Sequence, residues 1–135
     1  MSVFVDSSAL LAVMIANDDA HEAAGEVWGE LIVSDEGLVT TSYVLLETYS
    51  VLQRRHGLRY VDLLRSAAVP EMQVQWISPA QHETALSGVL AANRRDLSLV
   101  DCASFLVMRE LGLTRAFTLD AHFGEEGFRV LPGGR

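Results

Sequence analysis

The chain has 135 residues, half of which are hydrophobic, so it can bury a core without disulfide bonds or a structural metal. Its single cysteine, Cys102, excludes an internal disulfide and a multi-cysteine zinc site. The formal net charge of −8 argues against a protein that coats nucleic acid through phosphate contacts alone. It does not exclude an enzyme that acts on nucleic acid, because divalent ions bound to carboxylates reverse the local field.

Apolar runs alternate with amphipathic stretches along the chain, which predicts an α/β domain with a mainly parallel central sheet. In chain order we expect a strand over 3–5, helices over 7–16 and about 19–31, a strand over 38–41, helices over 42–56 and 59–69, a strand over 74–77, helices over 79–93 and 99–111, and strands over 116–119 and 128–131. Gly57 is in the position where a left-handed residue commonly ends a helix, and Gly112 ends a later one. We predict one domain over residues 1–135, with a disordered tail over about 132–135.

The sequence contains no candidate membrane segment. No apolar stretch approaches the roughly 20 residues that span a bilayer. The first apolar run is broken at Asp6, so no basic segment with an apolar signal core is expected. A single cysteine is compatible with a reducing compartment, and we therefore expect a cytoplasmic protein.

Two aspartates directly follow short apolar strands. Asp6 ends the sequence VFVD and Asp120 ends FTLD. In a parallel sheet both carboxylates emerge at the carboxyl ends of strands, which is the edge where open α/β sheets bind their ligands. Each aspartate also suits the alternative role of capping the helix that follows it, so the strand-end position leaves both roles open.

Two further acids interrupt apolar helical faces. The positions three and four residues from Glu47 and from Asp101 carry apolar or hydroxyl-bearing side chains and no basic residue. A half-buried carboxylate without a partner is unfavourable, so we expect compensation from outside the helix that carries it. A distant arginine or hydroxyl is one candidate. A cation shared with Asp6 and Asp120 is the simpler explanation, because it compensates all of these acids at once.

Carboxylates that lie close together repel one another unless their pKa values rise or cations neutralise them. Mg²⁺ and Mn²⁺ prefer oxygen ligands, and such ions activate water and stabilise charge on the oxygens of a phosphate. The acids therefore predict a site for Mg²⁺ (or Mn²⁺) that hydrolyses phosphodiester bonds. The predicted catalytic and metal-binding residues are Asp6, Glu47, Asp101 and Asp120.

Four segments of the chain resemble, in order and spacing, the PIN-domain nucleases, and within them the VapC toxins of bacterial VapBC (type II) toxin–antitoxin systems. The segments are FVDSSALLA, TSYVLLETYSVL, LSLVDCASFLVMRELG and AFTLDAHF. The resemblance covers nearly the whole chain and implies a three-layer α/β/α sandwich around a parallel sheet. It matches the four acids of the family, residue by residue, to Asp6, Glu47, Asp101 and Asp120, with Asp6 and Asp101 as the firmest metal ligands.

The resemblance also implies roles for residues around the acids. Ser7, Ser8 and Thr118 match positions where the family often has a hydroxyl near the site, although helix-cap and strand roles explain them equally well. His122 suits the D-x-H-F ending of the family, but we expect it to be a surface histidine. Four arginines near the helical acids are candidates for guiding RNA phosphates or for stabilising helix ends: Arg54, Arg55, Arg94 and Arg95.

By the same resemblance, the reaction is endonucleolytic cleavage of RNA by metal-activated water, which leaves a 5′-phosphate and a 3′-hydroxyl. The toxin assignment implies a small VapB-like antitoxin that covers the site, and the family tends to form homodimers. A stand-alone PIN nuclease in RNA processing is an alternative. A PIN-like scaffold that only binds a partner is another, and the presence of all four acids argues against it.

Other enzyme classes fit only parts of the sequence. A haloacid-dehalogenase-like phosphatase or a receiver domain also presents an aspartate after its first strand, but both rely on a lysine, and this chain contains none. The residues DSS also lack the second aspartate of the phosphatase motif. A cysteine hydrolase that uses Cys102 with His82 or His122 is a weaker alternative, because a free cysteine within an apolar helix usually belongs to the core.

Overall fold

Five parallel strands form the central sheet in the computed structural model, which describes residues 2–133. The strands are β1 (Val3–Val5), β2 (Leu38–Thr41), β3 (Gln73–Gln75), β4 (Arg115–Phe117) and β5 (Arg129–Leu131). Their order across the sheet is β3-β2-β1-β4-β5, and every neighbouring pair is parallel. The predicted α/β class and parallel sheet are confirmed.

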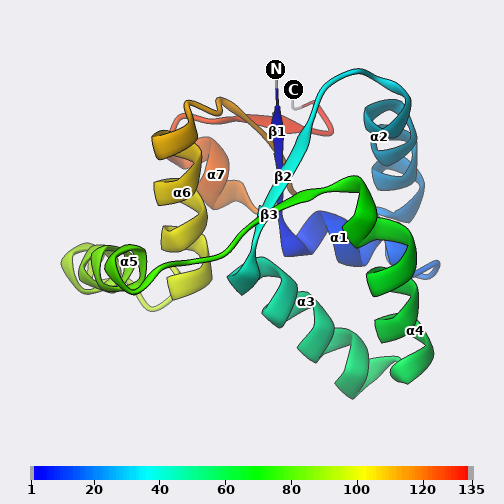
Figure 1. The fold of residues 1–135 in the computed structure, drawn as a ribbon, viewed down its shortest axis with the longest axis horizontal. Helices are drawn as coiled ribbons and strands as arrows, with labels where there is room; N and C mark the ends of the chain where they lie inside the picture. The colour runs from blue at the N-terminus through cyan, green and yellow to red at the C-terminus, as the bar shows by residue number, and fades with distance from the viewer. Residues whose placement is uncertain (1, 134–135) are drawn as a thin grey trace.

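Helices cover both faces of this sheet. They are α1 (Ser7–Met14), α2 (His21–Val33), α3 (Ser42–Arg55), α4 (Leu58–Leu63), α5 (Pro79–Ala92), α6 (Leu99–Leu111) and α7 (Ala121–Glu125). In Figure 1, α1, α2 and α4 lie on one side of the strands and α5, α6 and α7 on the other, while α3 extends from the end of β2. This arrangement is the three-layer α/β/α sandwich that the resemblance implied.

The order of the strands reverses at β1. From β1 the chain adds β2 and β3 on one side, and it then returns to add β4 and β5 on the other. In open parallel sheets, ligands bind in the crevice outside the carboxyl ends of the strands at such a reversal. Val5 lies opposite Phe117 in the register of β1 and β4, and the N–H of Asp6 donates to the Phe117 carbonyl over 3.0 Å. The residues that follow β1 and β4 therefore begin side by side at the carboxyl edge of the sheet.

An aromatic cluster fixes the short helix α7 against the middle of the molecule. Phe123 of α7 packs edge to face against Phe105 of α6, with 4.9 Å between ring centroids. It also stacks on Phe4 of β1 at 6.2 Å. All three rings are buried, so the segment that carries Asp120 is held against both β1 and α6.

Three predicted strands are one residue shorter than expected: those over 74–77, 116–119 and 128–131. In the first two, side chains take over backbone hydrogen bonds. The strand predicted over 74–77 runs from Gln73 to Gln75, since the N–H of Ile77 donates to the Ser42 hydroxyl instead of a neighbouring strand. The strand predicted over 116–119 ends at Phe117, and the N–H of Leu119 donates to the Ser8 hydroxyl. The second change brings the end of β4 toward α1.

Among the helices, the prediction was wrong in two places. The helix predicted over 59–69 becomes a π-helix over Leu64–Ala68 and then a 3-10 helix over Val69–Glu71, where Pro70 has no N–H to donate. Helix α7 was not predicted as an element. The other helices begin and end within two residues of their predicted bounds.

The two glycines agree with the prediction, and only part of the predicted disordered tail lies within the described residues. Gly57 and Gly112 follow the ends of helices with φ of 102° and 70°. Pro132 and Gly133 form a turn after β5, and residues 134–135 of the predicted tail lie outside the described residues. Within residues 2–133, no helix has the length and apolar character needed to cross a membrane.

Candidate active site

Asp6 directly follows β1, and the residue is only 3% exposed. Although Asp6 is the N-cap residue of α1, its side chain makes no capping bond. Its Oδ2 instead accepts hydrogen bonds from the Ser8 hydroxyl at 2.8 Å and the Thr118 hydroxyl at 2.9 Å. Burial raises the pKa of the Asp6 carboxyl, and the two hydroxyls hold this rise back. The alternative role as a helix cap is therefore wrong for Asp6.

Asp101 lies in the first turn of α6 and is 8% exposed. It forms a capping box with Ser98, whose N–H donates to Asp101 Oδ2 over 3.2 Å. The expectation that its compensation comes only from outside its own helix is therefore wrong, because the helix N-terminus supplies part of it. Burial raises the pKa of Asp101 to about 6, with further contributions from the charges of Asp120 and Asp6. The three aspartates therefore interact electrostatically.

Asp120 follows β4 and is the N-cap residue of α7. Its Oδ1 accepts a hydrogen bond from the N–H of His122 at 2.9 Å, so the capping role considered for Asp120 is present. The same carboxylate also faces Asp101: single ligand atoms from Asp101, Asp120 and His122 all lie within 4.8 Å of one another. Capping and cation binding are compatible at this residue, because each carboxylate oxygen has two lone pairs.

Glu47 lies beside this group without joining it directly. It is half-buried on α3, and its Oε1 accepts a hydrogen bond from the Ser7 hydroxyl at 2.5 Å. Ser7 is the neighbour of Asp6 in the chain, and Glu47 lines a pocket of about 450 Å³ with Leu99 and Val100, the residues before Asp101. The structure therefore brings Asp101 and Asp120 together, with Asp6 close enough to interact with both through its charge. Glu47 lies at the border of these acids, compensated by a hydroxyl.

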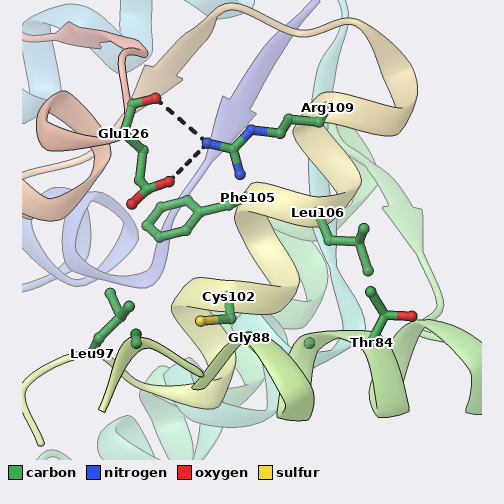
Figure 2. Close-up of a pocket in the computed structure, with 10 residues that line it drawn as sticks. Thr84, Gly88, Leu97, Cys102, Phe105, Leu106, Arg109 and Glu126 are labelled. Carbon is green, nitrogen blue, oxygen red and sulfur yellow. Dashed lines mark hydrogen bonds and ion pairs between the residues drawn. The ribbon is translucent and has the colours of Figure 1, made fainter. Parts of the chain in front are cut away.

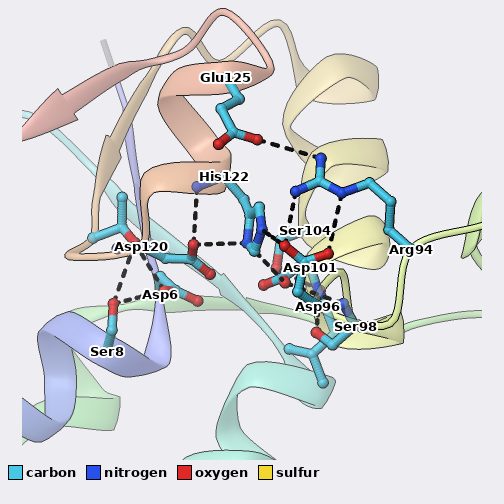
Figure 3. A network of polar contacts seen from close by, with 12 residues as sticks. Asp6, Ser8, Arg94, Asp96, Ser98, Asp101, Ser104, Asp120, His122 and Glu125 are labelled. Atoms are coloured by element: carbon cyan, nitrogen blue, oxygen red, sulfur yellow. Dashed lines mark hydrogen bonds and ion pairs between the residues drawn. The ribbon is translucent and has the colours of Figure 1, made fainter. Parts of the chain in front are cut away.

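His122 is a member of this site that the sequence interpretation placed on the surface. Its side chain is 17% exposed, and Figure 3 shows the ring between Asp96, Asp101 and Asp120. Nε2 lies 3.2 Å from Asp96 Oδ2, while Nδ1 lies 2.9 Å from Asp120 Oδ1 and 3.8 Å from Asp101 Oδ2. The hydrogen bond with Asp96 is the main reason that the pKa of His122 is raised. The D-x-H spacing was the available signal, because it puts the histidine in the first turn after Asp120.

The predicted RNA-binding arginines lie in different surroundings. Arg94 is close to the site, but it is ion-paired with Asp96 at 2.9 Å and with Glu125 at 3.4 Å. Arg95 is exposed next to it. Arg54 and Arg55 are exposed in the last turn of α3, where Arg54 is about 10 Å farther along the helix axis than Glu47. A phosphate-guiding role stays a prediction for all four.

Cys102 lines a pocket of about 270 Å³ between α5 and α6, and none of the four predicted acids lines this pocket. Figure 2 shows its thiol near Gly88, with the Arg109–Glu126 ion pair at another part of the lining. No histidine lines this pocket within the described residues. Burial also raises the pKa of the thiol, which disfavours the thiolate. The cysteine hydrolase alternative therefore has no support from the geometry.

The donor set fits a hard divalent cation. Asp6, Asp101 and Asp120 supply carboxylate oxygens at one crevice of the sheet, and such oxygens are the ligands that Mg²⁺ and Mn²⁺ prefer. Within residues 2–133, the arginine ion pairs involve other acids and none of these three. The charge of the cluster is therefore open to compensation by a metal ion.

Comparison with known proteins identifies the family of this chain. A family model described as PIN domain matches residues 3–128, and the chain belongs to this family. It is 31% identical over 129 residues to the 23S rRNA-specific endonuclease VapC20 of Mycobacterium tuberculosis, from strains CDC 1551 / Oshkosh and ATCC 25618 / H37Rv, and the match covers 93% of this chain and 95% of that protein. The resemblance to PIN-domain nucleases and VapC toxins is confirmed.

The structural comparison agrees with the sequence comparison. The crystal structure of VapC20 from Mycobacterium tuberculosis, described as a sarcin-ricin loop cleaving toxin, matches with a TM-score of 0.84 at 30% identity. The match covers 94% of this chain and 96% of that chain. The central sheet and its surrounding helices are therefore those of a PIN-domain nuclease.

Proposed function

We propose that this protein is a Mg²⁺- or Mn²⁺-dependent endoribonuclease, the toxin of a toxin–antitoxin pair, that acts on 23S ribosomal RNA. The observation that carries the proposal is the convergence of Asp6, Asp101 and Asp120 at the carboxyl ends of β1 and β4. Two of these acids are buried, and their pKa values are raised. A buried group of carboxylates without an arginine partner calls for a cation.

In this proposal the three aspartates hold the cation, and Glu47 borders the site from α3. A divalent ion held by carboxylates activates water and stabilises the charge that develops on phosphate oxygens. Ser8 and Thr118 keep the Asp6 carboxylate in one orientation through their hydrogen bonds to Oδ2. Preorganised ligands of this kind do not have to be rearranged when the ion and the substrate bind.

The substrate part of the proposal is supported by the relatives. They are named as a 23S rRNA-specific endonuclease and as a sarcin-ricin loop cleaving toxin, and the similarity to both extends over almost the full length of each chain. A stand-alone PIN nuclease in RNA processing would have the same acids. Purified ribosomes distinguish the two, because we expect one specific cut in 23S RNA rather than trimming of precursor ends.

The partner in this proposal is a VapB-like antitoxin with a basic segment that covers the acids. The net charge of −8 supports this choice, because opposite charge steers a basic segment to an acidic surface. We also propose a homodimer in the cytoplasm. Co-expression with the product of a small neighbouring reading frame should give a complex that does not cleave RNA, and size measurements on the free toxin should give twice the mass of the chain.

The chemistry is tested with wild type, Asp6→Asn and Asp101→Asn in RNA cleavage assays with Mg²⁺ or Mn²⁺. Asp62→Asn is the matched control. Asp62 is an exposed acid of α4, and it pairs with Arg65 in the π-helix that follows. We expect cleavage by wild type and Asp62→Asn, loss of at least about 100-fold in the other two variants, and complete inhibition by a chelator. Equal cleavage by all four proteins in the presence of the chelator would contradict the proposal.

A further inference from the structure

The ring of His122 has one nitrogen with a clear partner and one without. Nε2 faces Asp96 at 3.2 Å. Nδ1 is buried and makes no aligned hydrogen bond with any described residue, although Asp120 Oδ1 lies only 2.9 Å away and Asp101 Oδ2 lies 3.8 Å away. Figure 3 shows this nitrogen directed at the two carboxylates. A buried polar atom left in this way is uncommon and needs an explanation.

The bond to Asp96 determines which nitrogen carries the ring proton. Asp96 is exposed, and the adjacent Arg94 guanidinium lowers its pKa to about 2, so its carboxylate only accepts hydrogen bonds. Nε2–H therefore donates to Asp96. Nδ1 faces the oxygens of Asp120 and Asp101, and one ligand atom from each of the three residues lies within 4.8 Å of the others. Nδ1 and Asp120 Oδ1 are only 2.9 Å apart, so either a proton or a metal ion has to lie between them. The contact is not aligned as a hydrogen bond, which favours the metal ion.

We propose, on the basis of the proposed function, that His122 Nδ1 is a ligand of the divalent cation, together with Asp101 and Asp120. Two ligands at right angles around an ion about 2.1 Å from each are about 3 Å apart, which agrees with the 2.9 Å between Nδ1 and Asp120 Oδ1. The site then has a nitrogen ligand among its oxygens. Imidazole is a better ligand for transition metals than for Mg²⁺, so this site should prefer Mn²⁺ over Mg²⁺.

Asp96 and Arg94 act as positioning residues in this site. Histidines that bind metal ions commonly donate the other ring N–H to a carboxylate, which fixes the orientation of the ring. Asp96 fills this role, and Arg94 holds Asp96 with two hydrogen bonds, from Nε to Oδ1 at 3.1 Å and from Nη2 to Oδ2 at 2.9 Å. A further contact joins Arg94 to Glu125 at 3.4 Å. Arg94 therefore holds the loop before α6 in place through Asp96 and Glu125.

The experiment uses Mn²⁺ alone as the probe, with the full chain and without RNA. Electron spin-echo measurements detect coupling between bound Mn²⁺ and a directly bonded ¹⁴N nucleus, and titration of the Mn²⁺ signal gives the affinity. We expect ¹⁴N coupling in wild type and in the control His56→Ala, whose imidazole lies at the end of α3 against Tyr60. His122→Ala should lose the coupling and more than about tenfold in Mn²⁺ affinity.

Two further variants keep the test independent of folding defects. His122→Asn retains a polar group near the position of Nδ1, so it should bind Mn²⁺ without ¹⁴N coupling and with less preference over Mg²⁺. Asp96→Asn should bind Mn²⁺ about 10- to 100-fold more weakly but keep the coupling at saturation. Mn²⁺ that binds wild type and supports RNA cleavage without ¹⁴N coupling would overturn the inference and leave the proposed function intact. Chelator-resistant cleavage without Mn²⁺ binding would overturn both.

Discussion

Replacing Asp101 with asparagine should make the metal-free protein more stable at neutral pH. Asp101 is 8% exposed and lies near Asp6 and Asp120, so its negative form is unfavourable in the folded state. Asparagine has nearly the same shape and can still accept the hydrogen bond from the N–H of Ser98. The substitution therefore removes the charge and keeps the capping box.

The size of this effect follows from the change in pKa on folding. The pKa of Asp101 rises from 3.8 to about 6, which corresponds to about 3 kcal/mol at about 1.4 kcal/mol per unit. Below pH 3.8 both states are protonated, so the group does not affect stability. As pH rises toward 6, the unfolded chain releases its proton first, and stability falls until the folded carboxyl also ionises. About 1 kcal/mol of this loss develops between pH 5 and pH 8.

The assay is urea denaturation in EDTA at pH values from 5 to 8. This range stays above the pI of about 4.8, where low net charge promotes association. The free energy of unfolding of Asp101→Asn, relative to wild type, should rise by about 1 kcal/mol over the range. The same titration with Mn²⁺ should reverse the trend, because the ion stabilises the ionised wild-type site. A constant difference in EDTA would refute the reasoning that burial and repulsion raise this pKa.

Three other substitutions test parts of the site. Thr118→Val removes a buried donor to the Asp6 carboxylate and should lower the free energy of unfolding in urea by about 1–3 kcal/mol; an unchanged value would mean that water replaces the hydroxyl. Glu47→Gln should reduce RNA cleavage by about 10- to 100-fold, less than Asp6→Asn, because Glu47 only borders the acids through Ser7. Cys102→Ala should leave the cleavage rate within about twofold of wild type while costing about 1 kcal/mol of stability; loss of cleavage would revive the cysteine hydrolase.

The positions of Asp6 and Asp120 were predictable from two rules: a short apolar run forms a buried strand, and parallel strands end at the same edge of a sheet. Three consecutive apolar residues followed by Asp6 form a strand that is buried on both faces, as expected in a parallel sheet. The carboxyl ends of parallel strands lie at one edge, so Asp6 and Asp120 had to emerge on the same side. Which strands are neighbours does not follow from these rules. The adjacency of β1 and β4, which brings the two acids together, depends on the reversal in strand order.

The surroundings of Asp101 and His122 were not predictable from helical spacing. The predicted helix over 99–111 does begin directly after Ser98, but helical spacing alone did not identify Ser98 as the N-cap residue that forms a capping box with Asp101. The role of His122 depends on α7, a helix of 5 residues that is too short to give a periodic pattern. Its position is fixed instead by burial of Phe123 among rings from α6 and β1.

The burial and charge repulsion that make ionised Asp101 unfavourable in the metal-free protein should also strengthen cation binding. Ionised Asp101 destabilises the metal-free folded protein by about 3 kcal/mol. An ion that removes this destabilisation binds about a hundredfold more tightly because of this residue alone. Mn²⁺ at about 100 times its dissociation constant stabilises the folded state by about 2.7 kcal/mol, which raises the midpoint of thermal unfolding by roughly 8 °C for a chain of this size. Asp101→Asn should show only a small part of that rise. An equal rise in both proteins would mean that the ion binds away from the acids.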